Sequence, residues 1–236
     1  MPDTAPTNLN PRWLSDLKKR VGYCICFGLS QAQVEEAGNI MREVTNDWRE
    51  LTAGPEGFLT GPDRRVHVNN VVYNRYAESA RVKWLHNFAI HIDPQHNQDW
   101  MALATPNSLG LILQSIQTVY KFPLTWPDHI SVYHKLRPLP TDPSAFELDV
   151  IILSELHQRP AARCAESLLV YNYQQRRKIP MPPFMRDAFE TTIKLQEAAM
   201  KENSRRVQSL SERVRVLEKE SWDREGAKED MGSGAV

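Results

Sequence analysis

The chain has 236 residues, with 29 lysine and arginine residues against 29 aspartate and glutamate residues, and 41% of its residues are hydrophobic. This composition is typical of a soluble globular protein and allows one large domain or two small ones. A net charge of zero gives no overall field to attract nucleic acid or an anionic membrane, so no nucleic-acid partner is expected. The ten glycines do not cluster, which excludes the glycine-rich loops of dinucleotide-binding and P-loop proteins.

The cysteines and the N-terminal segment bear on the compartment. The chain has an odd number of cysteines, whose spacings fit neither a disulfide framework nor paired zinc knuckles: Cys24, Cys26 and Cys164. The apolar run Val21–Leu29 is shorter than a membrane span and lacks a small-residue cleavage site. Asp3 and Asp16 argue against a mitochondrial presequence. We expect a cytoplasmic protein without a membrane span, with a mitochondrial location not excluded.

An N-terminal helical extension is expected over residues 1–56. Ser30 and Gln33 have the spacing of a capping box, and Gly54 with Pro55 ends the helix that follows. Between these signals, apolar residues recur at alternating steps of three and four: Val34, Ala37, Met41, Val44, Trp48 and Leu51. This stripe predicts one amphipathic helix that packs against another part of the chain.

The middle segment, residues 57–189, mixes one helix with several strands. Helical spacing of apolar residues predicts a helix that begins near Asn70 and ends near the polar stretch His91–Asp99, with Tyr73, Tyr76, Ala77, Ala80, Trp84 and Phe88 on its inward face. Four strands are then expected at Leu111–Phe122, Ile130–Leu136, Phe146–Leu156 and Arg163–Tyr173. A buried helix followed by consecutive antiparallel strands predicts an α+β domain whose sheet wraps over the helix.

A C-terminal helix is expected over residues 190–225, followed by a disordered tail at 226–236. Apolar residues recur every seven positions, with Gln196 and Asn203 at two equivalent positions: Ile193, Met200, Val207 and Val214, with Leu210 and Leu217 as partners. Two interpretations remain open for this thin seam. The helix packs on its own subunit, or it forms a short coiled coil between protomers.

The densest group of polar side chains lies at Asp63–Asn70, directly before the predicted inward helix. A carboxylate and an imidazole there would lie beside unpaired backbone N–H groups, a setting that stabilises an oxyanion. The same residue types are also common in turns and as helix caps. The stretch His91–His96 contains possible metal ligands, but Pro94 and the lack of a third ligand favour a polar loop.

The segment His67–Arg81, which reads HVNNVVYNRYAESAR, resembles the helix-start signature of hot-dog-fold acyl-CoA thioesterases of the 4-hydroxybenzoyl-CoA thioesterase type. Tyr120–Leu124 is similar to the turn between the second and third strands of that family, and Asp128 to the acid that follows it. The strand Arg163–Tyr173 is similar to its last strand. The nearest resemblance is to fungal thioesterase-like proteins that carry helical extensions at both ends.

The resemblance implies an acyl-CoA substrate and a homodimer or dimer of dimers, with a tunnel at the dimer interface. It implies that Asp63 acts as nucleophile or general base, that His67 orients the acyl group, and that the backbone N–H of Asn70 binds the thioester oxygen. Coenzyme A enters as part of the substrate, and no separate cofactor or metal is expected. Three basic residues follow the last strand: Arg176, Arg177 and Lys178. They are either solvent-exposed residues at the end of that strand, or they contact the 3′-phosphate of coenzyme A.

Two departures from the family pattern lead to an alternative function. Val66 stands where the family has glycine, and Gly57–Pro62 is short for a first strand and ends in proline. The alternative is a catalytically inactive hot-dog domain that serves as a scaffold or complex subunit through its helical extensions. A hot-dog dehydratase is a third possibility, which the thioesterase-type helix start disfavours.

Overall fold

The computed structural model describes residues 9–60, 73–105, 108–125 and 127–229. The chain divides into two compact units. One unit comprises residues 57–200, and the other comprises residues 1–56 together with residues 201–236. The boundary expected after residue 189 falls inside a helix, α5 (Pro183–Glu220), whose residues belong to both units.

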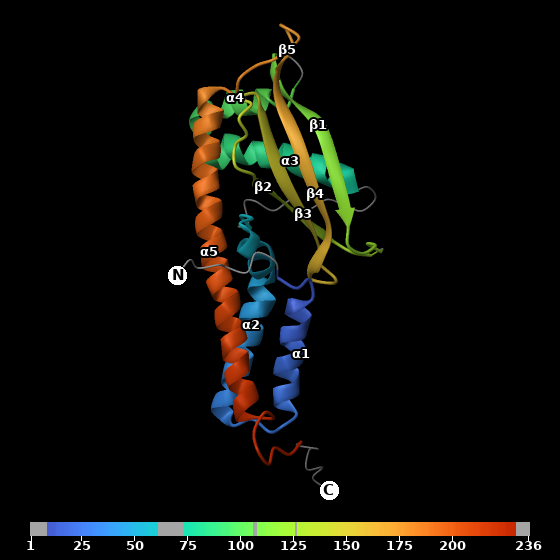
Figure 1. The fold of residues 1–236 in the computed structure, drawn as a ribbon, viewed down its shortest axis with the longest axis vertical. Helices are drawn as coiled ribbons and strands as arrows, with labels where there is room; N and C mark the ends of the chain where they lie inside the picture. Colours follow the sequence, from blue (N-terminus) through green and yellow to red (C-terminus); the bar gives the residue numbers. More distant parts are fainter. Residues whose placement is uncertain (1–8, 61–72, 106–107, 126, 230–236) are drawn as a thin grey trace. The chain divides into compact units, whose positions relative to one another are not determined.

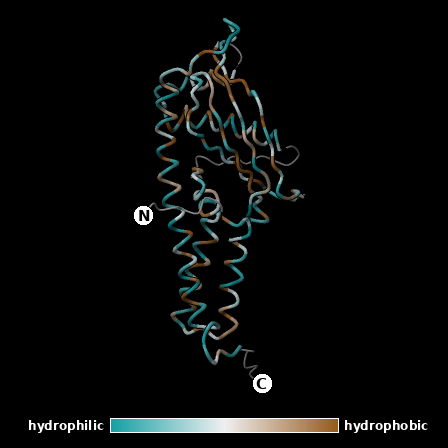
Figure 2. Tube along the Cα trace, viewed as in Figure 1, coloured by the Kyte–Doolittle hydropathy of each residue, from teal (hydrophilic) through white to brown (hydrophobic). Residues whose placement is uncertain are grey.

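The unit of residues 57–200 is built on an antiparallel sheet. Its strands follow the order β1-β4-β3-β2, and a short β5 pairs with the end of β4. The strands are β1 (Leu109–Tyr120), β2 (Ile130–Leu136), β3 (Ala145–Ser154), β4 (Arg159–Asn172) and β5 (Arg177–Lys178). The four strands predicted from the sequence are therefore confirmed, with ends that differ by a few residues. In Figure 2, brown hydrophobic residues recur along the strands, and buried positions run through β2, β3 and β4.

Helix α3 (Tyr73–Asn87) lies across one face of this sheet (Figure 1). Its inward residues enter two apolar clusters. One cluster joins Tyr76, Ala77 and Ala80 to the strands, and the other joins Trp84 and Phe88 to the strands and to the beginning of α5. The predicted inward face of the helix is thus confirmed, and the architecture is α+β with the sheet wrapped over a helix.

The polar stretch after α3 is helical rather than a loop. A π-helical turn, η3 (Phe88–Ile92), a short 3-10 turn, η4 (Pro94–His96), and α4 (Asn97–Ala102) follow without a strand. The Asp93 carboxylate explains this, because it lies 3.0 Å from His96 Nδ1 and accepts a hydrogen bond from Trp100 Nε1 at 3.0 Å. Trp100 is fully buried, so the segment is part of the core.

The second unit packs three helical segments: α1 (Trp13–Ile25), α2 (Gln31–Ala53) and the C-terminal part of α5. The capping box is confirmed, since Ser30 N donates to Gln33 Oε1 at 2.8 Å. Gly54, where a short 3-10 turn η1 (Gly54–Glu56) begins, leaves room for Asn203, because a Cβ at this position would overlap the Asn203 side chain. Helix α1 was not expected as a separate element from the sequence.

The part of the heptad seam of α5 that belongs to this unit is buried. Val207, Leu210, Val214 and Leu217 are each at most 6% exposed in the single chain. The apolar seam is therefore covered by the chain's own helices, as in the first of the two interpretations above. Ion pairs connect the same helices: Arg213 contacts Glu36 and Glu43, and Arg206 contacts Asp47.

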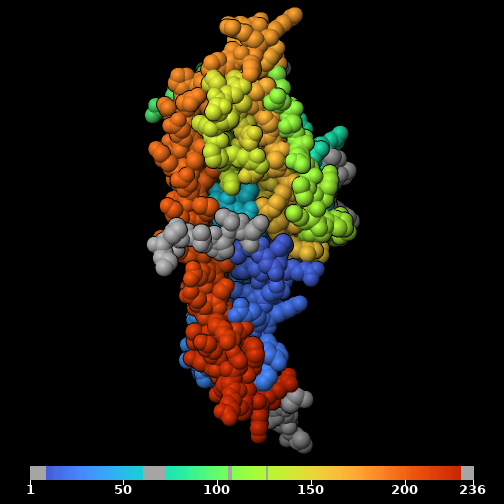
Figure 3. Space-filling model, in the orientation of Figure 1, coloured from blue at the N-terminus to red at the C-terminus, as the bar shows by residue number. Residues whose placement is uncertain are grey.

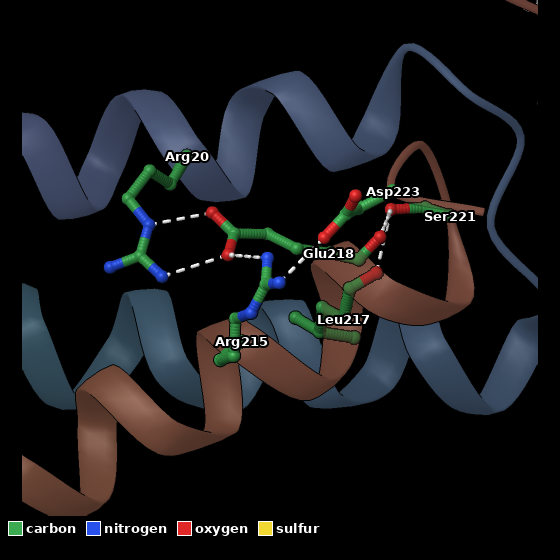
Figure 4. Close-up of polar contacts among 6 residues, drawn as sticks. All are labelled: Arg20, Arg215, Leu217, Glu218, Ser221 and Asp223. Carbon is green, nitrogen blue, oxygen red and sulfur yellow. Dashed lines mark hydrogen bonds and ion pairs between the residues drawn. The ribbon is translucent and has the colours of Figure 1, made fainter.

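Glu218 on α5 is the centre of a further ion-pair network, drawn in Figure 4. Arg20 of α1 donates to both carboxylate oxygens, from Nε at 2.6 Å and from NH2 at 2.9 Å. Arg215 bridges Glu218 and Asp223 at 3.3 and 2.6 Å. The hydrogen bonds from Arg20 are the main reason why the pKa of Glu218 lies below its usual value. Among the described residues, no helix is both long and apolar enough to cross a membrane.

Candidate functional site

The residues proposed for catalysis lie outside the described part of the chain. Asp63, His67 and Asn70 fall within residues 61–72, as does Val66. The predictions for them therefore stay predictions. What the structure describes is the start of α3, which follows this segment directly, and the surroundings of that helix start.

The first turn of α3 contacts the end of β1. Thr118 Oγ1 on β1 donates to Asn74 Oδ1 at 2.8 Å. The Tyr73 hydroxyl accepts a hydrogen bond from Leu124 N at 3.0 Å, and the Tyr73 ring packs edge-on against Tyr120 at 5.0 Å. The turn at residues 120–124, which resembles a family feature, is thus fixed to the helix start by a tyrosine side chain.

The same turn is attached to the beginning of β4. Lys121 N donates to Ala161 O at 2.8 Å. The guanidinium carbon of Arg159 lies 4.0 Å from the centre of the Phe122 ring, and the His157 ring contacts Phe122 edge-on at 5.1 Å. In Figure 3 the end of β1 and the turn after it, in green, lie beside the gold residues at the start of β4. This end of the sheet therefore combines the helix start with cationic and aromatic side chains.

Asp128, the acid that resembles a family position, is buried and its two carboxylate oxygens are both engaged. One accepts from Ser154 Oγ at 2.6 Å and the other from Leu156 N at 3.0 Å. These bonds hold the turn between β3 and β4. The geometry gives Asp128 a structural role at this turn.

A charged group that the sequence analysis missed lies between α3 and the sheet. Arg81 NH1 of α3 is 2.6 Å from Glu166 Oε1 on β4, and His134 Nε2 on β2 is 3.7 Å from the other carboxylate oxygen. The side chains of Glu166 and His134 are 0% and 1% exposed. The cluster separates the two apolar clusters described above. The signal was present in the sequence, because Arg81 and Glu166 occupy inward positions of the helical and strand patterns.

Burial controls the titration of this group. Complete burial, and then the nearby positive charge of Arg81, lower the pKa of His134 to about 3, so the imidazole is neutral near pH 7. Burial also raises the pKa of Glu166, while Arg81 acts in the opposite direction. His134 Nε2 and Glu166 Oε2 have no hydrogen-bond partner among the described residues.

Cys164 is a buried thiol on the inner face of β4. Thr118 Oγ1 lies 3.4 Å from its sulfur. Burial raises the pKa of the Cys164 thiol, which disfavours the reactive thiolate. Cys164 is therefore a packing residue and a poor nucleophile.

The basic run proposed as a coenzyme A contact lies on an exposed turn and hairpin at the other end of β4. Lys178 Nζ pairs with Asp142 at 2.8 Å, and Arg177 Nε donates to Gln175 at 3.0 Å. Arg177 is paired with Asn172, whereas the end of β1 is paired with Ala162. Ten residues of β4 separate these points, which is about 33 Å along a strand. Arg176, Arg177 and Lys178 are therefore far from the start of α3 within one chain.

No metal centre is found in the described ranges, where no group of three histidine, cysteine, aspartate or glutamate side chains is placed to hold an ion. In the segment His91–His96, which was considered for metal binding, the Asp93 carboxylate contacts the side chains of His96 and Trp100.

The fold and the helix start define the class of the domain. An antiparallel sheet wrapped over one central helix, with strands in the order β1-β4-β3-β2, is a hot-dog architecture. Residues 62–189 match the model of the Thioesterase-like superfamily, which covers more than half of the chain. The protein belongs to this superfamily. No curated protein matches the chain.

Solved structures with a similar fold include several thioesterases. A thioesterase from Thermus thermophilus, complexed with coenzyme A and zinc, is 19% identical, with 58% of this chain and 92% of that chain covered and a TM-score of 0.41. A DHNA-CoA thioesterase from Staphylococcus aureus is 12% identical, with 57% and 93% covered and a TM-score of 0.44. A 1,4-dihydroxy-2-naphthoyl-CoA thioesterase from Synechocystis is 15% identical, with 53% and 93% covered and a TM-score of 0.42.

Proposed function

We propose that the protein binds an acyl-CoA thioester and hydrolyses it to the free acid and coenzyme A. The observation that carries this proposal is the superfamily match, which begins at residue 62 and so includes the helix-start signature with Asp63, His67 and Asn70. The described part of the chain supports it, because α3 follows the signature directly and packs on the sheet as expected for the fold.

The proposed chemistry uses the residues at the helix start. The Asp63 carboxylate attacks the thioester carbonyl, or it takes a proton from the water that attacks. The negative charge that develops on the carbonyl oxygen is stabilised by the Asn70 N–H near the positive end of the helix dipole. His67 orients the acyl group. The C–S bond then breaks and coenzyme A leaves as a thiolate, which is a good leaving group, so no strong general acid is required. Where Asp63 is the nucleophile, this step leaves an acyl–Asp63 anhydride, which a water molecule then hydrolyses to the free acid and the Asp63 carboxylate.

We also propose that two chains pair through β1. Among the described strands, β1 stands at the end of the order and has no neighbour on its outer side. Three of its hydrophobic residues are exposed: Leu113 at 36%, Val119 at 45% and Tyr120 at 61%. An exposed edge of this length and composition favours pairing with a second copy, which would extend the sheet. The site would then draw on the helix start of one protomer and on strands of the other.

The test is thioester hydrolysis by the purified full-length protein. Short, long and aromatic acyl-CoAs are incubated with the protein and a thiol reagent that reports free coenzyme A. We expect turnover of at least one substrate, and a loss of about 100-fold or more in kcat for Asp63→Asn, because the carboxylate would be the nucleophile or base. Asp187→Asn, an exposed aspartate on α5, is the matched control. Full activity of Asp63→Asn would rule out the role assigned to Asp63.

A second candidate is a scaffold without activity. It is favoured by Val66 in place of glycine, and by Gly57–Thr60, which lie outside any strand although Gly57, Phe58 and Thr60 are buried. Its helical extensions would then bind a partner. Absence of turnover on the whole substrate panel, together with a partner lost when residues 201–236 carry substitutions, would favour this candidate over the thioesterase.

A further inference from the structure

At the end of the sheet where α3 begins, one cation lies over an aromatic ring and a second cation directly precedes that ring in the chain. Lys121 is exposed and directly precedes Phe122. The Arg159 guanidinium lies over the face of the same ring, with its carbon 4.0 Å from the ring centre. The hydrogen bond from Lys121 N to Ala161 O fixes the two segments to each other at 2.8 Å.

Neither cation has an anionic partner among the described residues. Arg137 and Lys178 of the same unit do have such partners, because Arg137 pairs with Asp149 and Glu147, and Lys178 pairs with Asp142. The contact of Arg159 with the Phe122 ring is a cation–π contact, which uses no N–H donor of the guanidinium. Its N–H groups lie in the plane of the group and stay available to an anion.

The position of these cations matches the proposed chemistry. Leu124, three residues after Lys121, donates its backbone N–H to Tyr73 at the start of α3. Three residues span at most about 10 Å of chain, so Lys121 lies near the helix start. The other basic group, Arg176–Lys178, lies at the far end of β4.

We infer that Lys121 and Arg159 form a phosphate-binding site for the nucleotide part of the coenzyme A substrate, with Phe122 holding the guanidinium in place. This inference rests on the proposed function. An arginine donates two hydrogen bonds to one phosphate, and a lysine adds a second charge, which is a common arrangement for phosphate recognition. The His157 ring, 5.1 Å from Phe122, supports the aromatic side chain from its edge.

The test is binding of coenzyme A, dephospho-coenzyme A and pantetheine to the full-length protein, measured by calorimetry. Lys121→Gln and Arg159→Gln should each weaken coenzyme A binding about tenfold or more, as expected for a hydrogen bond to a charged group. Pantetheine binding should not change. If dephospho-coenzyme A binding is unaffected, the 3′-phosphate occupies the site, and if it weakens equally, the diphosphate does. Either result supports the inference.

Matched variants separate the possible failures. Lys194→Gln and Arg186→Gln, on α5 and without an ion pair in the described structure, should bind coenzyme A like the unaltered protein. Normal coenzyme A binding by both site variants would overturn the inference and leave the proposed function intact. So would a loss of binding in Arg176→Gln and Arg177→Gln that the site variants do not show. Absence of binding of any coenzyme A derivative by the unaltered protein would overturn both.

Discussion

The buried group of Arg81, Glu166 and His134 is the most unusual feature at the scale of single residues. Removing a charge from water is costly, and a buried carboxylate is tolerated only with a close partner. Arg81 supplies this partner at 2.6 Å, while His134 is neutral near pH 7 and needs no counter-charge. The cluster therefore ties the central helix to the middle of the sheet.

The low pKa of His134 predicts a loss of stability in acid. The folded-state pKa is about 3, below the ordinary value of 6.5 that applies in the unfolded chain. Stability from the neutral form is thus complete above pH 6.5 and falls as the pH drops toward 3, by up to about 1.4 kcal/mol per pH unit. Between pH 7 and pH 5, we expect the unaltered protein to lose about 1–2 kcal/mol more unfolding free energy than His134→Gln, measured with urea.

The comparison with His134→Gln is needed because the groups around His134 also titrate. The raised pKa of Glu166 acts in the opposite direction, since protonation of Glu166 below its folded pKa favours the folded state. Glu78 also repels the Glu166 carboxylate and raises its pKa further. Subtracting the variant's pH profile leaves mainly the His134 contribution. Parallel profiles for the two proteins would show that His134 is not the group responsible.

At the scale of elements, β2 stands at one end of the order of described strands, and a side chain of α5 hydrogen-bonds with its edge. Gln196 on α5 is 5% exposed, and its amide makes two hydrogen bonds with one residue of β2. Leu136 N donates to Gln196 Oε1, and Gln196 Nε2 donates to Leu136 O, both at 2.9 Å. The amide thus reproduces the pair of bonds that a neighbouring strand would make.

Loss of this amide should destabilise the sheet edge. We expect Gln196→Ala to lower the free energy of unfolding by about 1–3 kcal/mol, because it leaves a buried N–H and C=O without partners. Hydrogen exchange of the Leu136 amide should become faster at the same time. The exposed neighbour Glu197 provides the control, Glu197→Ala, which should change neither quantity. Unchanged exchange at Leu136 in Gln196→Ala would contradict the assigned role.

Local patterns predict the elements well where one face is continuously apolar. Ile130–Leu136 has the predicted bounds, and the capping box places the start of α2 correctly. Helix α1 was not expected from the sequence, although its buried residues recur at helical spacing: Leu14, Leu17, Val21 and Cys24. Gln196 stands out in the sequence only as a polar residue in an apolar seam, because its partner on β2 is 60 residues away.

The candidate site is less predictable than the elements, for a physical reason. The motif at Asp63–Asn70 is local and readable, whereas the contacts that bring Arg159 over Phe122 and Glu166 next to Arg81 depend on strand register. Register is set by the packing of whole strands, so pairs across the sheet cannot be read from spacing in the chain.

At the scale of the whole molecule, the two ends of the chain form one unit. Arg20 and Glu218 are 198 residues apart in sequence and share two hydrogen bonds. From the sequence the ends are expected to be separate extensions, because each has its own apolar stripe and no local pattern links them. The apolar seam of α5 in this unit is buried against the unit's own helices, so it is not available to a second chain. The exposed edge of β1 is therefore the better candidate for self-association.

Pairing through β1 predicts a specific change in mass. We expect the unaltered protein to have twice the mass of one chain by light scattering, and Leu113→Lys with Val119→Lys to shift it toward the monomer, because charges on an edge strand oppose strand pairing. The circular dichroism spectrum should stay unchanged, since both side chains are already exposed. Val82→Lys, at an exposed position of α3, is the control and should remain dimeric. A monomeric unaltered protein, or an equal shift in the control, would contradict pairing through β1.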